Sequence, residues 1–192
     1  TVLKSRVVFY NFSALGKNAG ANRVVGGFTD HFSGKMVGRV HFFNNDESFA
    51  AYNGGLSFFS TRVKTSPEEK KNIEIPGTIR MMSYNSQYLA LLTDNTKEKE
   101  EENYRLLLFR KNGEKLFDKA LNFLGTKMEL SGDKILLYQE KNYKVYDFSG
   151  RLRYNGETKE GLLYLRSMTD FKMNGTELML CFPNKVERVV LQ

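Results

Sequence analysis

A chain of 192 residues is long enough to bury a sizeable core and corresponds to one large domain or two small ones. Its hydrophobic content of 41% and aromatic content of 13% exclude an intrinsically disordered protein. The net charge of +7 suits an anionic neighbour such as a membrane surface, a wall polymer or nucleic acid. No compact block of basic residues stands out, so dispersed lysines that keep the protein soluble are the simpler interpretation.

The first third of the chain has the pattern of short strands separated by turns. Its Phe, Tyr and β-branched residues favour β structure, and no segment keeps a helical period. The clearest hairpin signal is Asn53-Gly54-Gly55, which predicts a tight turn with positive φ at Asn53-Gly54. Strands are expected at Arg6–Phe12, Arg23–Phe28, Gly38–Phe43, Ser48–Tyr52 and Leu56–Ser60.

The middle of the chain combines strands with two charged segments. Lys64–Asn72 is predicted to be a polar surface loop that leads into Ile73–Ile75. Within it, Glu68–Lys71 is predicted to form at most a single helical turn. The charged run Lys97–Glu102 could be an acidic ligand or cation site. A solvated long hairpin loop explains it more simply. Strands are expected at Thr78–Ser83, Tyr88–Leu92, Tyr104–Phe109 and Lys115–Lys119.

The stretch Ser131–Tyr154 carries the strongest strand pattern in the sequence. Lys134–Gln139 and Tyr143–Asp147 are joined by a tight connection, and a Ser-Gly turn leads into a third strand near Leu152–Tyr154. This predicts most of one four-stranded antiparallel sheet. Further strands are expected at Thr126–Leu130, Leu162–Phe171, Glu177–Phe182 and Val186–Leu191.

This unit recurs along the chain. Periods of about 40 to 50 residues with four short strands each are typical of β-propeller blades. A turn glycine also recurs four residues beyond an aromatic residue, at Phe12/Gly16, Phe109/Gly113 and Tyr146/Gly150. Equivalent strand positions, separated by 49, 50, 37 and 44 residues, are Tyr10, Phe59, Phe109, Tyr146 and Val190.

We therefore predict an all-β chain of β-propeller-like repeats. The repeats are four-stranded antiparallel blades, about four in number, in an incomplete propeller. The whole chain, 1–192, forms this partial domain, and its terminal blades are incomplete. The blades are placed roughly at 1–34, 35–76, 77–121, 122–160 and 161–192.

Four segments carry a resemblance to a known family: Phe42–Ser60, Tyr88–Asn95, Leu108–Leu121 and Gly132–Gly156. On these segments the chain resembles the C-terminal part of a Firmicutes domain-of-unknown-function family. The resemblance implies a membrane-anchored protein with an extracytoplasmic propeller-like domain, and it implies no catalytic residues. The chain itself has no apolar segment of about 20 residues and no signal peptide. Because it begins at Thr1, we expect a piece of a longer protein whose anchor lies outside this chain.

The sequence predicts no metal site. His31 and His41 are ten residues apart, and a zinc site would need a closer histidine pair or cysteine partners. Asn44–Glu47 has calcium-type ligands but lacks the length and glycine of an EF-hand loop, so an Asx turn explains it better. Cys181 cannot form an intrachain disulfide, and its apolar run Leu178–Phe182 predicts a buried, unreactive core thiol.

Catalytic and cofactor motifs are likewise not found in the sequence. Gly26-Gly27 and Gly54-Gly55 are not phosphate-binding loops, because no Gly-Lys-Ser/Thr follows them. Aromatic residues beside basic ones could stack on bases or sugars, but alternation in half-buried strands explains them more simply. These are Tyr143-Lys144 and Arg151–Tyr154. The serines that lack a nucleophile-elbow context are Ser13, Ser33 and Ser60.

Three functions fit these observations. The leading hypothesis is a non-enzymatic extracytoplasmic binding or scaffold module that recognises an unknown protein or an anionic cell-wall polymer. The second is an enzyme whose active site is built across several blades, for which the inner strands offer only Glu129 and Asp170. The third is binding of an anionic polymer through the basic surface; a nucleic acid is not expected, because it would need a contiguous basic face.

The repeat also predicts open sheet edges. The first repeat lacks its early strands and the last lacks its outer strand, so two edges remain unpaired. The rest of a larger propeller could cover them, two copies of the chain could pair edge to edge, or the blades could stay open as a curved stack whose end strands are shielded by charged residues such as Lys4, Arg6 and Arg188. We expect the isolated chain to form a homodimer through these edges.

Overall fold

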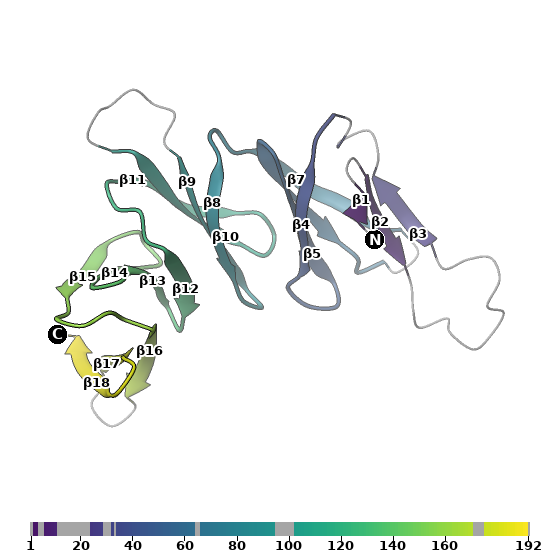
Figure 1. Ribbon diagram of the computed structural model, residues 1–192. Helices are drawn as coiled ribbons and strands as arrows, with labels where there is room; N and C mark the ends of the chain where they lie inside the picture. The colour runs from purple at the N-terminus through teal and green to yellow at the C-terminus, as the bar shows by residue number, and fades with distance from the viewer. Residues whose placement is uncertain are drawn as a thin grey trace. The chain divides into compact units, whose positions relative to one another are not determined.

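The structure is a computed structural model, and it confirms an all-β chain. It describes residues 2–3, 6–10, 24–28, 32, 34–63, 66–94, 102–170 and 175–191. In this part of the chain the strands β1 to β18 make five sheets, and within each sheet the strands are neighbours in chain order (Figure 1). Some residues named in the sequence analysis lie outside the described residues. These are Lys4, Phe12, Ser13, Gly16, His31, Ser33 and all of Lys97–Glu102 except Glu102.

The chain divides into two compact units. The first consists of Thr1–Ile79, Ser86–Tyr88 and Phe109–Glu114, and the second of Arg80–Asn85, Leu89–Leu108 and Lys115–Gln192. The first unit holds a three-stranded sheet of β1 (Val2–Leu3), β2 (Arg6–Tyr10) and β3 (Val24–Phe28). It also holds a four-stranded sheet of β4 (Val37–Phe42), β5 (Glu47–Tyr52), β6 (Gly55–Ser60) and β7 (Glu68–Glu74).

Most of the other three sheets belongs to the second unit. The first of them consists of β8 (Ile79–Tyr84), β9 (Tyr88–Asp94), β10 (Tyr104–Arg110) and β11 (Lys115–Leu121). The next consists of β12 (Lys127–Ser131), β13 (Lys134–Gln139), β14 (Asn142–Asp147) and β15 (Leu152–Glu157). The last has three described strands, β16 (Tyr164–Asp170), β17 (Gly175–Cys181) and β18 (Val186–Leu191).

The predicted repeat holds at four of its five positions. Phe59, Phe109, Tyr146 and Val190 lie on β6, β10, β14 and β18, each the third strand of its sheet, whereas Tyr10 lies on β2, the second of the three described strands of the first sheet. The recurring turn glycine is also confirmed where it is described, because Gly113 has φ +81° and Gly150 has φ +79°. A side chain is strained at such positive φ, which explains why glycine recurs at this turn.

The predicted Asn53-Gly54 hairpin is present. Tyr52 pairs with Gly55 across it, and Gly54 has φ +90°. The positive φ holds for Gly54 alone: among the described non-glycine residues, Glu140 is the one with positive φ. The turn therefore fixes the register of β5 against β6 with one glycine in the left-handed region.

The predicted surface loop at Lys64–Asn72 is wrong from Glu68 onward, and so is the helical turn at Glu68–Lys71. Residues Glu68–Glu74 form β7, the outermost strand of its sheet. Five of its seven side chains are exposed, and only Glu69 and Ile73 are half-buried. Lysine and glutamate are common on edge strands because their charges discourage pairing with other chains. The charge pattern is thus that of an edge strand rather than a loop.

The prediction of a buried thiol at Cys181 is also wrong, because this side chain is partly exposed. On β17, Leu178 and Leu180 are buried, whereas Met179 and Cys181 alternate with them and are half-buried. Successive side chains of a strand point to opposite faces of the sheet. Among the described residues of β17, the face of Leu178 and Leu180 is therefore more deeply covered than the face of Met179 and Cys181.

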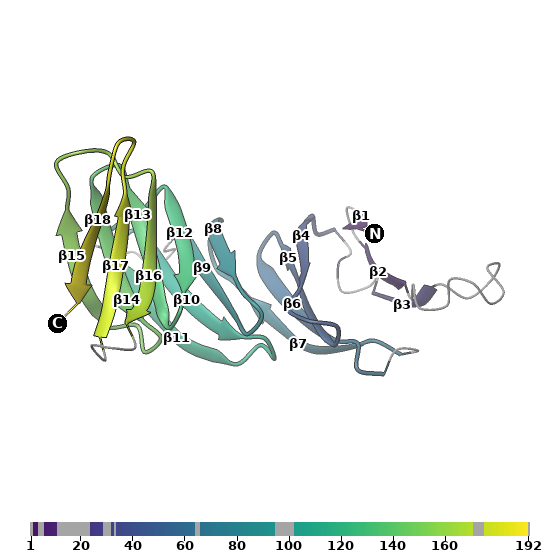
Figure 2. The same cartoon turned by 90° about the horizontal axis from the view of Figure 1, so that it is seen from below.

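Each unit has its own hydrophobic core. In the first unit the Phe9 ring lies against the Phe59 ring, with centroids 5.3 Å apart, and joins β2 to β6. The buried members of this core are Val7, Phe9, Phe32, Val37, Ala50, Tyr52 and Phe59. In the second unit a core fills the space between the sheets β12–β15 and β16–β18, which lie side by side (Figure 2). Its buried members are Leu136, Tyr138, Tyr143, Val145, Leu162, Leu165, Leu178, Leu180 and Phe182.

Serine hydroxyls link the first strands of three consecutive sheets in the second unit. The Leu130 amide on β12 donates to Oγ of Ser83 on β8 at 2.9 Å. The Ser131 hydroxyl donates to the Ser167 carbonyl on β16 at 2.9 Å and accepts from the Ser167 amide at 3.0 Å. Ser131 and Ser167 are both buried, so these bonds satisfy polar groups that water does not reach.

Candidate functional site

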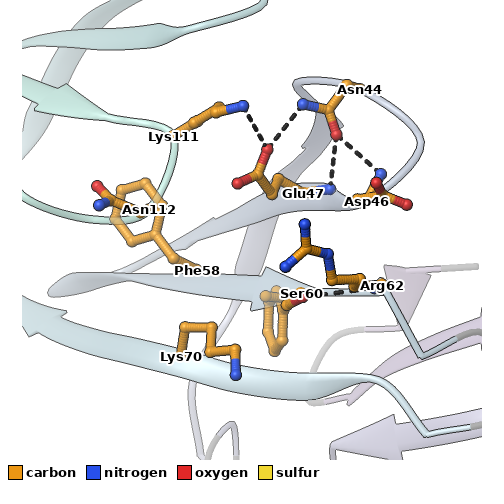
Figure 3. A pocket seen from close by; sticks show the side chains of 10 residues that line it. Asn44, Asp46, Glu47, Phe58, Ser60, Arg62, Lys70, Lys111 and Asn112 are labelled. Atoms are coloured by element: carbon orange, nitrogen blue, oxygen red, sulfur yellow. Dashed lines mark hydrogen bonds and ion pairs between the residues drawn. The ribbon is translucent and has the colours of Figure 1, made fainter.

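A pocket of about 480 Å³ lies within the first unit, at the end of the sheet β4–β7 where its strands turn (Figure 3). The turn between β4 and β5, the end of β6, the strand β7 and the turn between β10 and β11 all contribute to it. Its lining residues are Asn44, Asp46, Glu47, Phe58, Phe59, Ser60, Arg62, Lys70, Lys111 and Asn112. Three of these side chains carry a positive charge and two carry a negative charge.

The predicted Asx turn forms the upper rim of the pocket in Figure 3. Oδ1 of Asn44 accepts from the Asp46 amide at 2.8 Å and from the Glu47 amide at 3.0 Å. Nδ2 of Asn44 donates to Oε2 of Glu47 at 2.7 Å. The asparagine therefore holds the turn and one of the pocket carboxylates at the same time, and no calcium ion is needed to explain these residues.

A network of charges joins this rim to the turn between β10 and β11. Nζ of Lys111 lies 2.8 Å from Oε2 of Glu47, and both side chains are partly buried. Burial alone would raise the pKa of Glu47, but the hydrogen bonds from Lys111 and Asn44, together with the charges of Lys111 and Arg62, outweigh it and hold this pKa below its ordinary value. Glu47 is therefore ionised at neutral pH and fixes the Lys111 ammonium at the edge of the pocket.

The turn between β10 and β11 is positioned by close packing on Phe58. A Cβ atom at Gly113 would lie 2.9 Å from Cδ2 of Phe58, and Phe58 is fully buried. Phe58 also packs on Phe109, with ring centroids 6.0 Å apart. Only glycine combines this contact with the positive φ of the turn, so Gly113 places Lys111 and Asn112 at the pocket.

A second connection ties the end of β6 to the rim. The Thr61 amide donates to the Asp46 carbonyl at 2.7 Å, and the Thr61 hydroxyl donates to the Asn45 carbonyl at 2.9 Å. These bonds place Arg62 beside the turn of β4 and β5, where its guanidinium points into the space between Glu47 and Ser60 (Figure 3). The pocket thus offers a guanidinium, ammonium groups, amides and a hydroxyl, which can bind an anionic or strongly polar group.

The residues considered for catalysis lie elsewhere. Glu129 lies on β12, and its Oε1 accepts a hydrogen bond from the Tyr164 hydroxyl at 3.0 Å. Asp170 ends β16, and its side chain lies outside the described residues. Burial and the bond to Glu129 raise the pKa of Tyr164 above its ordinary value, so this phenol stays protonated near neutral pH. The structure does not bring Glu129 to the pocket.

The candidate metal ligands are not gathered either. Among the described residues no group of three or more His, Cys, Asp or Glu could hold a metal ion. His41 lies on β4 beside the Phe49 ring, and burial together with Arg39 lowers its pKa.

No helix in the described part of the chain is long and apolar enough to cross a membrane.

The tyrosines of β14 and β15 have a structural role. Tyr143 is buried and its ring stacks on Tyr154 with centroids 5.7 Å apart, so it is not open to a base or sugar. Several lysines of the second unit also have partners. Nζ of Lys119 donates to the Gly150 carbonyl at 3.1 Å, and Nζ of Lys127 donates to the Leu163 carbonyl at 2.7 Å. Part of the positive charge therefore stabilises the fold.

Comparison with known proteins assigns the chain to a family. Residues 1–191 match the model of a family of unknown function, DUF5711. The chain belongs to this family. Its predicted membership in a domain-of-unknown-function family is thus confirmed. A search of curated proteins finds no match for the DUF5711 chain.

Solved structures similar to the DUF5711 chain show its fold. The WD40 domain of SCAP from fission yeast has a TM-score of 0.51 and 8% identity over 81% of this chain and 42% of that chain. BBS1N, solved in complex with ARL6DN, has a TM-score of 0.55 and 11% identity over 87% of this chain and 55% of that chain. WD40 domains are β-propellers, so the predicted propeller-like fold class is confirmed. The DUF5711 chain spans about half the length of these structures.

The sequence alone does not reveal the pocket of the DUF5711 chain. In the sequence, Asn44–Glu47 indicates a turn and Ser60 has no catalytic context, and nothing connects the two. No sequence motif marks Arg62 or Lys111 as a binding residue. They lie 49 positions apart in the sequence, yet both line the pocket. The recurring turn glycine at Gly113 was the available signal, because it marks the turn that brings Lys111 to the sheet β4–β7.

Proposed function

We propose that this chain is a non-enzymatic binding or scaffold module that recognises a protein partner at the turn end of the sheet β4–β7. One observation carries the proposal: turns from separate sheets meet there in a pocket that offers charged and amide groups to a ligand. Propeller-like folds present such turns at the ends of their blades. BBS1N, a structure of similar fold, was solved in complex with ARL6DN, and this use of the fold for protein binding supports the same use here.

A display selection tests the proposal. Peptides from a random library are selected on the immobilised chain and then measured on three variants. We expect the selected peptides to lose binding to Lys70→Ala and Lys111→Ala, which remove charges of the pocket. They should bind Lys141→Ala as well as the wild type, because Lys141 lies on the turn between β13 and β14 in the second unit.

The selection can also contradict the proposal. Peptides that bind the wild type and all three variants equally would place recognition elsewhere. Selection that enriches no peptide would count against a protein-binding module. Circular dichroism of each variant verifies that the sheets remain folded, so that a loss of binding reports on the pocket.

An anionic cell-wall polymer is the second candidate ligand. The net charge of +7 favours it. Polymer binding through dispersed lysines would weaken steeply with added salt and would change little on removal of any single lysine. Titration of the chain with poly(glycerol phosphate) at two salt concentrations distinguishes this behaviour from the localised loss expected for a pocket.

We also propose that the module is extracytoplasmic and is attached to the membrane by a segment outside this chain. The resemblance on Phe42–Ser60 and Gly132–Gly156 supports this location. The test is a fusion of the complete reading frame to alkaline phosphatase, which is active only outside the cytoplasm. An inactive but intact fusion would contradict the location.

The isolated chain is proposed to form a homodimer through its open sheet edges. Within the described strands, β18 pairs with β17 alone, so one side of β18 is available for a further strand. Light scattering should give about twice the chain mass of 22.1 kDa at high concentration. A well-folded species that remains monomeric at every concentration would contradict the homodimer.

A further inference from the structure

Arg62 is the pocket cation that makes no ion pair within the described residues, although its charge helps to lower the pKa of the neighbouring Glu47. Lys111 pairs with Glu47 at 2.8 Å, and Lys70 pairs with Glu68. Within the described residues the Arg62 guanidinium makes no ion pair, and its backbone amide alone contacts Ser60. Figure 3 shows the guanidinium directed into the pocket between Glu47 and Ser60. It is therefore ready to bind an anion from outside.

Asp46 provides the opposite charge at the same pocket. Its backbone amide is held by Asn44 and its carbonyl by Thr61, so the position of the residue is fixed. In the described part of the chain its carboxylate has no ion pair and no hydrogen bond. Within the described residues the pocket thus presents one guanidinium and one carboxylate that make no ion pair.

The chemistry of Arg62 and Asp46 favours a carboxylate over a phosphate. A guanidinium is planar and binds a carboxylate through two parallel hydrogen bonds. A phosphate or polyphosphate brings two or more negative charges, which would be repelled by Asp46 and Glu47 in the same lining. A single carboxylate brings less repulsion, and a cation next to it would be attracted by Asp46.

From these contacts we infer that the pocket binds an acidic side chain of a partner peptide whose neighbouring residue is basic. Arg62 binds the carboxylate and Asp46 binds the adjacent ammonium or guanidinium. The volume of about 480 Å³ is within the range of pockets that hold groups of this size. The inference rests on the proposed function as a protein-binding module, and it names the class of peptide.

The test uses the tetrapeptide acetyl-Gly-Glu-Lys-Gly-amide and follows backbone amide shifts of the folded chain by NMR. We expect shifts confined to residues 44–47, 60–62 and 111–113. Arg62→Gln should weaken binding by about tenfold or more, because it removes hydrogen bonds to a charged group. Arg39→Gln is the matched control, since Arg39 is an exposed arginine on β4 of the same unit, and it should leave binding unchanged.

Two further peptides test the role of each charge. With Glu-Glu in place of Glu-Lys, binding should be weaker to the wild type, and Asp46→Asn should reverse this preference. With Gln-Lys, binding should be lost. Amide shifts outside the pocket should stay the same in Arg62→Gln and Asp46→Asn, which shows that both variants are folded.

Three results would overturn the inference: tighter binding of inorganic phosphate than of Glu-Lys, equal binding of Glu-Glu and Glu-Lys, or unchanged binding in Arg62→Gln. These results are separable from failure of the proposed function. If selected peptides require Lys70 and Lys111 but Glu-Lys does not bind, the binding module stands and the mixed-charge ligand is refuted.

Discussion

Replacing Gly156 with Ala should destabilise the second unit, because the Tyr143 ring packs on the bare backbone at this position. Tyr143 and Gly156 are opposite each other in the register of β14 and β15. A Cβ atom at position 156 would lie 2.2 Å from Cζ of Tyr143. Tyr143 is 3% exposed and stacks on Tyr154, so its ring has no space into which to move.

The expected loss follows from two opposing effects. Overpacking in a core costs about 1–3 kcal/mol, whereas removing a glycine from the unfolded chain stabilises by about 0.4–1 kcal/mol. We therefore expect Gly156→Ala to lower the free energy of unfolding by about 1–2 kcal/mol. For a chain of this size that corresponds to a drop in Tm of about 2–8 °C, which calorimetry or a denaturant titration measures.

Two further variants make this reasoning refutable. Gly161→Ala is the matched control, because a Cβ atom there has no described atom within 4 Å, and its stability should be equal or slightly higher. In a Tyr143→Leu background, Gly156→Ala should cost less, since the ring is gone. Equal stability of Gly156→Ala and the wild type would show that the ring does not press on the β15 backbone.

Three other predictions concern separate parts of the chain. Gly54→Val should cost about 1 kcal/mol or more, because a β-branched residue is strained at φ +90° although no described atom crowds it; an unchanged Tm would contradict the turn assignment. Cys181 should react with a thiol reagent in the folded state, since it is partly exposed. Labelling that occurs only with denaturant would show instead that the thiol is buried, as the sequence predicted. The pKa of Glu47 is lowered from 4.5 on folding, so its stabilising effect is present above about pH 4.5 and lost as the pH falls through the folded-state pKa; the difference in stability between the wild type and Glu47→Gln should vanish there, and a constant difference would argue against the ion pair.

The sequence predicted the sheets well because strand patterns and turn residues act locally. Glycine at Gly54 and the spacing of Phe59, Phe109 and Tyr146 are enough to place hairpins and repeats. The errors arose where a strand departs from the buried pattern. The strand β7 is charged because it forms a sheet edge, and its sequence resembles a loop.

The pocket was beyond sequence reasoning for a different reason. Arg62, Lys111 and Glu47 come together through contacts between separate sheets, and no local pattern encodes such contacts. The Asx turn at Asn44 was predicted correctly because its hydrogen bonds join residues two and three positions apart. The burial of Cys181 depends on how far other residues cover its face of β17, and an apolar run in the sequence does not reveal this.

The position of β18 at the side of its sheet has a consequence for hydrogen exchange. In an antiparallel strand, alternate amides point toward opposite neighbours. Among the described strands β18 has β17 as its neighbour on one side, so every second amide of Val186–Leu191 is bonded and the others face outward. Deuterium should therefore enter β18 in two classes, fast and slow, along a single strand. A strand bound along this side would merge the two classes into one slow class, so exchange at β18 reports directly on whether the edge is occupied.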